Sequence, residues 1–185
     1  MSPPELELEP ARPGGPVLIY AVSGLGKTTL RDAYPEAVVD ADEFLYDAVA
    51  RAFPDLEPRA RLMEWRLLCR SKPWVTGGES LALWAETRKA FVQPFLKLMW
   101  GTSARLVVTS LRAPPWVVSA WYGVERGKYM EHLALAGRVA DNDQSEAKND
   151  RLEGHSPMVR LAPGEFLGQR EELLRLVSSR VHAAD

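Results

Sequence analysis

Short apolar runs alternate along the chain with longer segments in which apolar residues recur every three or four positions. A short apolar run bounded by turn residues is typical of a buried strand, and the three-four spacing is typical of an amphipathic helix. We expect strands at 17–20, 37–40, 105–109, 116–122 and 158–161. We expect helices at 27–34, 42–51, 59–70, 80–99, 128–136 and 165–181. This alternation predicts an α/β fold with a parallel five-stranded sheet flanked by helices.

The segment between the second and third predicted strands, about residues 55–100, is helical in pattern. Its large side chains Trp65, Trp84, Phe91 and Phe95 fall on one side of their predicted helices. Such a stripe indicates packing against a neighbouring helix rather than a ligand site. We therefore expect a helical insert within a single domain that runs from residue 16 to 185.

A glycine-rich turn joins the first predicted strand to the first predicted helix. It reads Ala21-Val22-Ser23-Gly24-Leu25-Gly26-Lys27-Thr28. Strand, glycine-rich turn, Lys-Thr and helix in this order are the pattern of a phosphate-binding loop, or P-loop. The usual pattern opens with Gly where this chain has Ala21, which is the smallest side chain after Gly.

The physical chemistry of such a turn explains the residues in it. Two glycines let the backbone bend so that successive N–H groups point at an anion, and the helix that follows adds the positive end of its dipole. Lys27 is expected to reach the β- and γ-phosphates of a nucleotide, and the Thr28 hydroxyl to ligate Mg²⁺. The expected nucleotide-binding residues are Ser23, Gly24, Leu25, Gly26, Lys27, Thr28 and Thr29.

Two further groups are expected at the same edge of the sheet, because ligands bind at the carboxyl ends of parallel strands. One is the pair Asp40 and Asp42, and the other is Ser110 with Arg112. A carboxylate facing a γ-phosphate can orient an attacking hydroxyl and accept its proton, or help to hold Mg²⁺. Either carboxylate could be the catalytic base, and we favour Asp42 over Asp40. Asp40 is also assigned to the metal, together with Thr28. Asp42 could instead be a helix N-cap.

The third predicted strand ends without an acidic residue, at Val108-Thr109-Ser110. A motor-type ATPase needs a carboxylate there, and a GTPase needs an Asn-Lys-x-Asp motif that this chain lacks. Both classes are therefore disfavoured.

Cations that close over a transferring phosphoryl group should follow the fourth strand, because the transition state spreads negative charge over its oxygens. Arg138, Arg126 and Lys128 are the candidates, and Arg138 beside Gly137 is the preferred one. The polar run 141–151 is typical of a lid or acceptor-contact loop, within a lid of about residues 126–156. It is equally typical of an inert loop followed by a helix.

The composition of the chain limits which partners and which cellular compartment it suits. The formal net charge is −2, which gives no overall attraction to nucleic acid or to an anionic membrane. The single cysteine, Cys69, excludes an internal disulfide and suits a reducing cytoplasm. Residues 1–15 are rich in Pro, Gly and Glu and predict a disordered leader; no membrane span, secretory signal or obligate protein partner is evident.

The loop followed by a short strand and Asp40-Ala41-Asp42 resembles the P-loop kinases of the polynucleotide-kinase and nucleotide-kinase type. The second half, with Lys128–Leu133, Gly137-Arg138, a polar lid and Arg160–Leu167, is similar to small kinases encoded by bacteriophages. The resemblance implies the P-loop NTPase fold, Asp42 as general base, and a host-cytoplasm location for a phage-encoded chain. Some such kinases phosphorylate 5-hydroxymethyluracil in phage DNA.

These observations together predict an ATP- and Mg²⁺-dependent phosphotransferase acting on a hydroxyl of a nucleotide or nucleic-acid acceptor. The hydroxymethyl group of 5-hydroxymethyluracil in phage DNA is the favoured acceptor. A nucleoside monophosphate kinase, a kinase of small metabolites or antibiotics and a toxin directed at nucleotide sugars are the alternatives within the class. The alternative from another class is a nucleotide-binding regulator or NTPase that has no phosphoryl acceptor.

Overall fold

The computed structural model describes residues 14–101, 103, 105–138 and 143–183. In that part of the chain, five strands form one sheet in the order β2-β3-β1-β4-β5, and every neighbouring pair is parallel. The strands are β1 (Val17–Ala21), β2 (Val38–Asp40), β3 (Leu106–Thr109), β4 (Val118–Val124) and β5 (Met158–Leu161). The predicted α/β fold with a parallel five-stranded sheet is confirmed.

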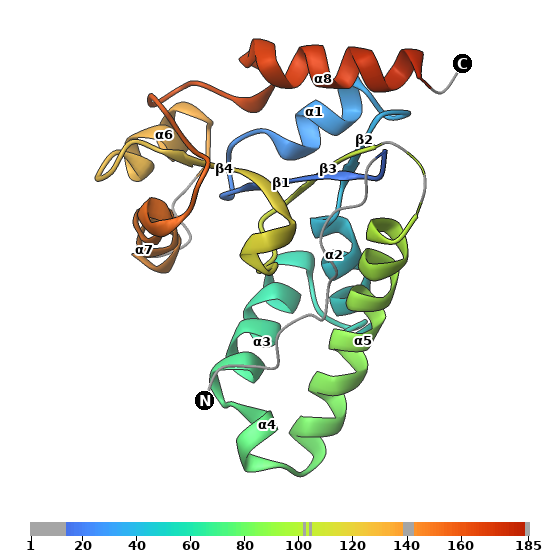
Figure 1. Ribbon diagram of the computed structural model, residues 1–185. Helices are drawn as coiled ribbons and strands as arrows, with labels where there is room; N and C mark the ends of the chain where they lie inside the picture. The colour runs from blue at the N-terminus through green and yellow to red at the C-terminus, as the bar shows by residue number, and fades with distance from the viewer. Residues whose placement is uncertain (1–13, 102, 104, 139–142, 184–185) are drawn as a thin grey trace.

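Helices cover both faces of the sheet, as Figure 1 shows: α1 and α8 lie on one face, and α2 and α5 lie on the other. The predicted leader, residues 1–15, falls almost entirely outside the described residues. The helices are α1 (Lys27–Ala33), α2 (Asp42–Ala52), α3 (Pro58–Arg70), α4 (Pro73–Thr76), α5 (Glu79–Met99), α6 (Tyr129–Leu135), α7 (Asp143–Asp150) and α8 (Glu171–His182).

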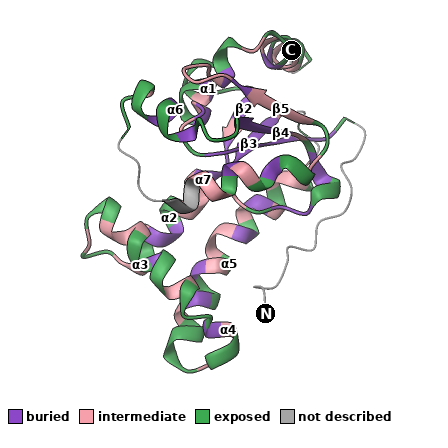
Figure 2. Ribbon diagram, turned by 90° about the vertical axis from the view of Figure 1, so that its left-hand side faces the viewer, coloured by how far each residue is buried: buried purple, intermediate pink, exposed green. Residues whose placement is uncertain are grey.

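Two hydrophobic cores hold these layers together. The larger one surrounds the sheet, whose central strands carry fully buried side chains such as Leu18, Leu106 and Val107 (Figure 2). The smaller one lies within α2–α5 and consists of Val49, Trp65 and Trp84 with half-buried neighbours. The aromatic stripe of this segment is therefore packing, as the sequence predicts.

The structure corrects two local expectations and assigns part of the polar run. Residues 115–117 form a 3₁₀ turn, led by Pro114 and Pro115, so the fourth strand begins only at Val118. The last helix begins at Glu171 rather than at residue 165, because Phe166 is extended and Leu167–Gln169 form a separate 3₁₀ turn. Residues 143–150 of the polar run form helix α7.

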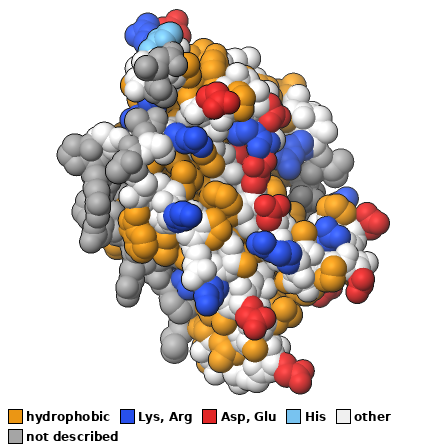
Figure 3. Space-filling model, turned by 90° about the vertical axis from the view of Figure 1, so that its right-hand side faces the viewer, with side chains coloured by type: hydrophobic (Ala, Val, Ile, Leu, Met, Phe, Trp, Pro, Cys, Tyr) orange, Lys and Arg blue, Asp and Glu red, His pale blue; other side chains and the backbone are white. Residues whose placement is uncertain are grey.

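The surface is mixed in charge. On the face drawn in Figure 3, basic and acidic side chains are interspersed among hydrophobic ones. No helix in the described ranges combines the length and apolar character needed to cross a bilayer.

Candidate phosphate-binding site

The glycine-rich turn after β1 directs its carbonyl groups away from the pocket that it borders. The hydroxyl of Tyr129 donates to the Ser23 carbonyl at 2.8 Å, and the Leu167 N–H donates to the Leu25 carbonyl at 3.0 Å. The Gly26 carbonyl accepts from the Leu30 N–H at 2.9 Å, inside the first turn of α1.

His132 holds the remaining carbonyl of this turn. Its Nδ1 accepts a hydrogen bond from the Gly164 N–H at 3.2 Å, so the ring proton resides on Nε2. Nε2 then donates to the Gly24 carbonyl at 3.0 Å. His132 is fully buried and, with one ring proton, neutral. It connects the glycine-rich turn to Gly164, which lies between β5 and the 3₁₀ turn η3 (Leu167–Gln169).

The directions of the carbonyl groups determine where the N–H groups of the turn point. A carbonyl and the N–H of the next residue point in opposite directions across a trans peptide bond. Because the carbonyls of residues 23 to 25 are bonded away from the pocket, the N–H groups of Gly24, Leu25 and Gly26 turn the other way. The turn therefore presents a concave row of donors of the kind that binds anions.

Both glycines of the turn are required by the backbone. Gly24 has φ 87° and Gly26 has φ 82°, a region that side chains disfavour. A Cβ atom at Gly24 would also lie 2.7 Å from Cδ2 of Leu133 on α6. The positive φ therefore favours glycine at position 24, and a side chain there would also have to displace the end of Leu133.

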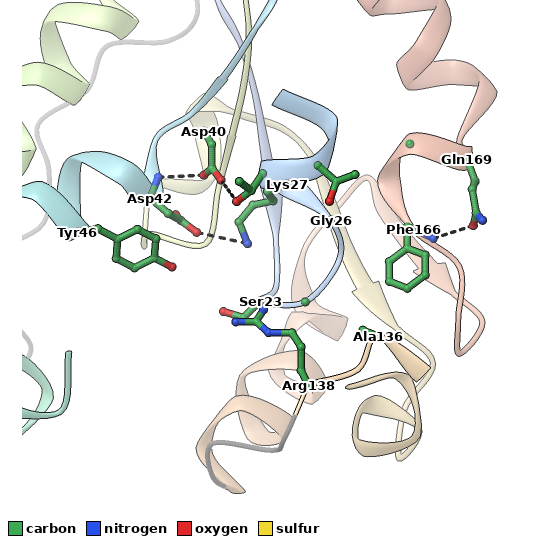
Figure 4. Close-up of a pocket in the computed structure, with 14 residues that line it drawn as sticks. Ser23, Gly26, Lys27, Asp40, Asp42, Tyr46, Ala136, Arg138, Phe166 and Gln169 are labelled. Carbon is green, nitrogen blue, oxygen red and sulfur yellow. Dashed lines mark hydrogen bonds and ion pairs between the residues drawn. The ribbon is translucent and has the colours of Figure 1, made fainter. Parts of the chain in front are cut away.

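Lys27 is buried at the first position of α1 and reaches back over the turn. Its ammonium group donates to the carbonyls of Ala21 and Val22 at 3.1 and 3.3 Å. It also forms an ion pair with Asp42 Oδ2 at 3.3 Å. The positive charge therefore sits between the turn and the end of β2, as Figure 4 shows.

Asp42 is held by the end of β3 rather than by its own helix. Its Oδ1 accepts from the Thr109 hydroxyl at 2.9 Å and from the Ser110 N–H at 2.7 Å. Its Oδ2 accepts from the Ser110 hydroxyl at 2.7 Å as well as facing Lys27. With 3% of its surface exposed, Asp42 is a fixed carboxylate, and the N-cap of α2 is Ala41 rather than Asp42.

Asp40 lies next to Thr28. The Thr28 hydroxyl donates to Asp40 Oδ2 at 2.8 Å, and the Asp42 N–H donates to Oδ1 at 3.2 Å. Burial raises the pKa of Asp40, and the charge of Asp42 raises it further. A hydroxyl and a carboxylate in contact are the hard oxygen ligands that Mg²⁺ uses beside substrate phosphates, so this pair fits the predicted metal.

A cavity of about 570 Å³ joins these groups. It is lined by the turn, by both carboxylates, by Tyr46 of α2, by Arg138 after α6, and by Phe166 and Gln169 before α8 (Figure 4). Ser23, Thr28 and Thr29 also line it, whereas the side chain of Leu25 is buried in the main core.

Arg138 is aimed by the end of α6. Gly137 has φ 68°, and the N–H groups of Gly137 and Arg138 donate to the carbonyls of Ala134 and Leu133. This pair of bonds is the Schellman motif, which closes a helix and fixes the residue after it. Arg138 Nη1 lies 3.8 Å from where a Cβ of Gly24 would be.

The other two predicted cations lie elsewhere. Arg126 is exposed and pairs with Glu153 at 3.4 Å, and Lys128 is exposed and pairs with Glu131 at 3.3 Å. Neither lines the cavity. Among the three candidates, the structure brings Arg138 alone to the glycine-rich turn.

Sequence reasoning missed the residues that support the turn from a distance. Tyr129 and His132 are one helical turn apart on α6, a spacing that puts both on one face. A Tyr and a His on an amphipathic helix give no signal of their target, because the turn that they contact lies more than a hundred residues earlier.

Comparison of the chain with models of protein families, with curated proteins and with solved structures finds no match.

Proposed function

We propose that this protein is a P-loop phosphotransferase that moves the γ-phosphoryl group of ATP to a hydroxyl of a nucleotide or nucleic-acid acceptor. One observation carries the proposal. The glycine-rich turn, whose carbonyl groups are bonded away from the cavity, borders the same cavity as Lys27, Thr28, Asp40 and Asp42. Phosphoryl transfer depends mainly on positioning and charge stabilisation, and these groups supply both.

The geometry favours Asp42 over Asp40 as the base. Lys27 is the partner of Asp42 Oδ2 that can leave, because a triphosphate in the turn would draw its ammonium toward the β- and γ-phosphates. Oδ2 can then accept the proton of the acceptor hydroxyl while Thr109 and Ser110 keep the carboxylate in place. The hydroxyl oxygen bonds to the γ-phosphorus, and the bond to the bridging oxygen breaks and leaves ADP.

Thr28 and Asp40 would hold the magnesium ion that accompanies ATP. When bound, the metal neutralises charge on the phosphate oxygens. Arg138, which lies beside Gly24 and lines the same cavity, would face the same oxygens.

The choice of acceptor rests on the resemblance to phage kinases. The first acceptor to test is therefore DNA that contains 5-hydroxymethyluracil, whose hydroxymethyl group would receive the phosphoryl group. Incubation with ATP labelled at the γ-phosphate should move label to one member of a panel of nucleosides, nucleoside monophosphates and oligonucleotides. Lys27→Ala should abolish transfer. Asp42→Asn should lower turnover about a hundredfold or more while ATP binding persists.

A control distinguishes the rival function. Label that appears only in free phosphate, whatever acceptor is offered, would show an NTPase without an acceptor. Full turnover in Asp42→Asn would move the base role away from that residue.

A further inference from the structure

Two aromatic side chains line the cavity on opposite sides of its phosphate-binding groups. Phe166 lies beside the glycine-rich turn, with its Cβ 3.6 Å from the position that a Cβ of Gly26 would take. Tyr46 lies on α2, near Asp42. Figure 4 shows Lys27 between the two rings. The mechanism proposed above assigns no part to Tyr46.

The ring of Tyr46 is exposed at the wall of the cavity. Its neighbours Phe44 and Leu45 pack against the larger and the smaller hydrophobic core, respectively. Neither core, in the part of the chain that the structure describes, includes Tyr46, and 47% of its surface is exposed. The packing of α2 therefore does not explain a large ring at this position.

The place of Tyr46 relative to Asp42 follows from helix geometry. Residues four positions apart lie on one face of a helix, with about 5–6 Å between their Cβ atoms. Asp42 and Tyr46 are the first and fifth residues of α2, and both line the cavity. An exposed aromatic ring thus lies one helical turn from the proposed catalytic base.

The chemistry of phosphoryl transfer assigns the two rings to different substrates. The attacking and leaving oxygens lie roughly in line on opposite sides of the γ-phosphorus. Asp42 marks the side of the attacking hydroxyl, so the rest of the donor nucleotide extends to the other side, toward Phe166. The Phe166 ring is fixed there, 5.1 Å from the ring of His132. Tyr46 is therefore on the acceptor side.

We propose that Tyr46 is the stacking surface for a planar ring of the acceptor. Every nucleobase has a π-face, and stacking on an aromatic side chain binds a base whatever its hydrogen-bonding pattern. The acceptor is then a nucleoside-type molecule, with a heterocyclic ring a few bonds from its hydroxyl, rather than a sugar or another alcohol without a ring. This inference rests on the proposed function and names the residue that selects its acceptor.

Calorimetry on nucleotide-loaded protein tests the stacking surface. The protein is saturated with Mg²⁺ and the non-hydrolysable analogue AMPPNP, which fills the glycine-rich turn. It is then titrated with 5-hydroxymethyl-2′-deoxyuridine, thymidine, 2′-deoxyadenosine or 2-deoxyribose, which has no aromatic ring. We expect at least one nucleoside to bind and 2-deoxyribose not to bind measurably. Tyr46→Ala should weaken binding of that nucleoside about tenfold or more, because the stacking surface is lost.

Two further variants control for a merely structural effect. Tyr46→Phe keeps the ring and should bind the nucleoside within about twofold of the wild type. Trp100→Ala removes another half-exposed aromatic ring, at the end of α5 and not among the residues that line the cavity, and should leave the affinity unchanged. Heat from AMPPNP binding that matches the wild type shows that each variant has folded.

The outcomes separate this inference from the function on which it rests. Loaded wild-type protein that binds none of the nucleosides, or binds 2-deoxyribose as tightly as a nucleoside, overturns the stacking surface alone. Equal affinity for the nucleoside in the wild type and in Tyr46→Ala has the same meaning. Failure of AMPPNP to bind overturns the proposed function.

Steady-state kinetics give a second measurement. For the acceptor that takes up label from ATP, Tyr46→Ala should raise KM about tenfold with a smaller change in kcat, because stacking holds the acceptor equally in the ground state and the transition state. A fall in kcat with an unchanged KM would contradict the stacking surface.

Discussion

At the scale of single residues, the hydrogen bonds of Asp42 distinguish a carboxylate of the candidate site from an ordinary helix cap. The sequence places this carboxylate at the start of a helix, where Asp is common in any protein. The structure joins it to Thr109 and Ser110, of which Ser110 is 68 positions away in the chain. A local pattern could therefore predict Asp42 as a candidate but could not predict what holds it.

Replacing Ser110 tests that contact. Ser110→Ala removes the hydroxyl donor to Asp42 Oδ2 and keeps the backbone donor to Oδ1. We expect kcat to fall about tenfold, because one hydrogen bond to a charged group is lost, with the affinity for AMPPNP unchanged. Ser179→Ala on α8 is the control, and an unchanged kcat in Ser110→Ala would contradict the role assigned to β3.

Cys69 tests the smaller core at the same scale. Burial raises the pKa of its thiol to about 11, although Trp84 and Lys148 act in the opposite direction. At pH 8 a thiol-specific reagent should therefore react about a hundredfold more slowly than with a free cysteine of pKa about 8.5. Because the thiolate is disfavoured in the folded state, the free energy of unfolding should fall as the pH rises from about 8.5 to about 11.

The urea-denatured protein is the reference for this rate. Native protein that reacts as fast as denatured protein would show that α3 and α5 do not enclose the thiol.

At the scale of elements, α6 has two tasks. It supports the glycine-rich turn through Tyr129 and His132, and its Schellman end aims Arg138 at the same turn. The sequence predicts this helix almost to the residue, from 128–136 against Tyr129–Leu135. The contacts of α6 with the glycine-rich turn could not be predicted from the sequence, because the two segments are far apart in the chain.

Tyr129→Phe tests the support. The change removes the donor of a part-buried hydrogen bond to the Ser23 carbonyl, a bond of the kind that contributes about 0.5–1.5 kcal/mol. We expect the affinity for Mg²⁺–AMPPNP to fall about tenfold by calorimetry. Tyr34→Phe at the end of α1 is the control, and equal affinity in both variants would contradict the supporting role.

Helix α7 shows why the sequence left two interpretations of the polar run open. Its composition is typical of a loop, and its hydrophilic residues give no helical stripe. One buried side chain, Asn149, replaces the missing apolar face by bonding to the backbone of β4. A pattern of apolar positions cannot register an anchor made of hydrogen bonds.

Gly123→Ala tests this anchor. A Cβ at Gly123 would lie 2.7 Å from Asn149 Oδ1 and 3.0 Å from Arg160 Nη1. We expect a loss of about 1–3 kcal/mol in the free energy of unfolding by urea, since overpacking displaces α7. Gly154→Ala, where nothing lies within 4 Å, should change it little, and equal stability in the two variants would contradict the packing described.

At the scale of the whole molecule, the arrangement of layers follows from patterns that the sequence shows directly. Apolar runs predict the five strands, and their parallel pairing follows from the helices between them. The strand order β2-β3-β1-β4-β5 could not be read in the same way, because pairing is a contact between distant segments. That order brings the turn after β1, Asp40 at the end of β2 and Ser110 after β3 to one edge of the sheet.

The last helix marks the limit of local patterns at this scale. Its predicted start at residue 165 is wrong, because the Leu167 N–H bonds to the Leu25 carbonyl instead of entering a helix. The chain before α8 is thereby recruited to the wall of the cavity, where Phe166 and Gln169 lie.

The proposed function requires the glycine-rich turn to bind a nucleoside triphosphate, and calorimetry with Mg²⁺–AMPPNP measures this directly. Wild-type protein should bind one equivalent, and Lys27→Ala should bind at least about tenfold more weakly, since it loses the cation that faces the phosphates. Absence of heat in the folded wild type with both adenine and guanine triphosphate analogues would contradict the account.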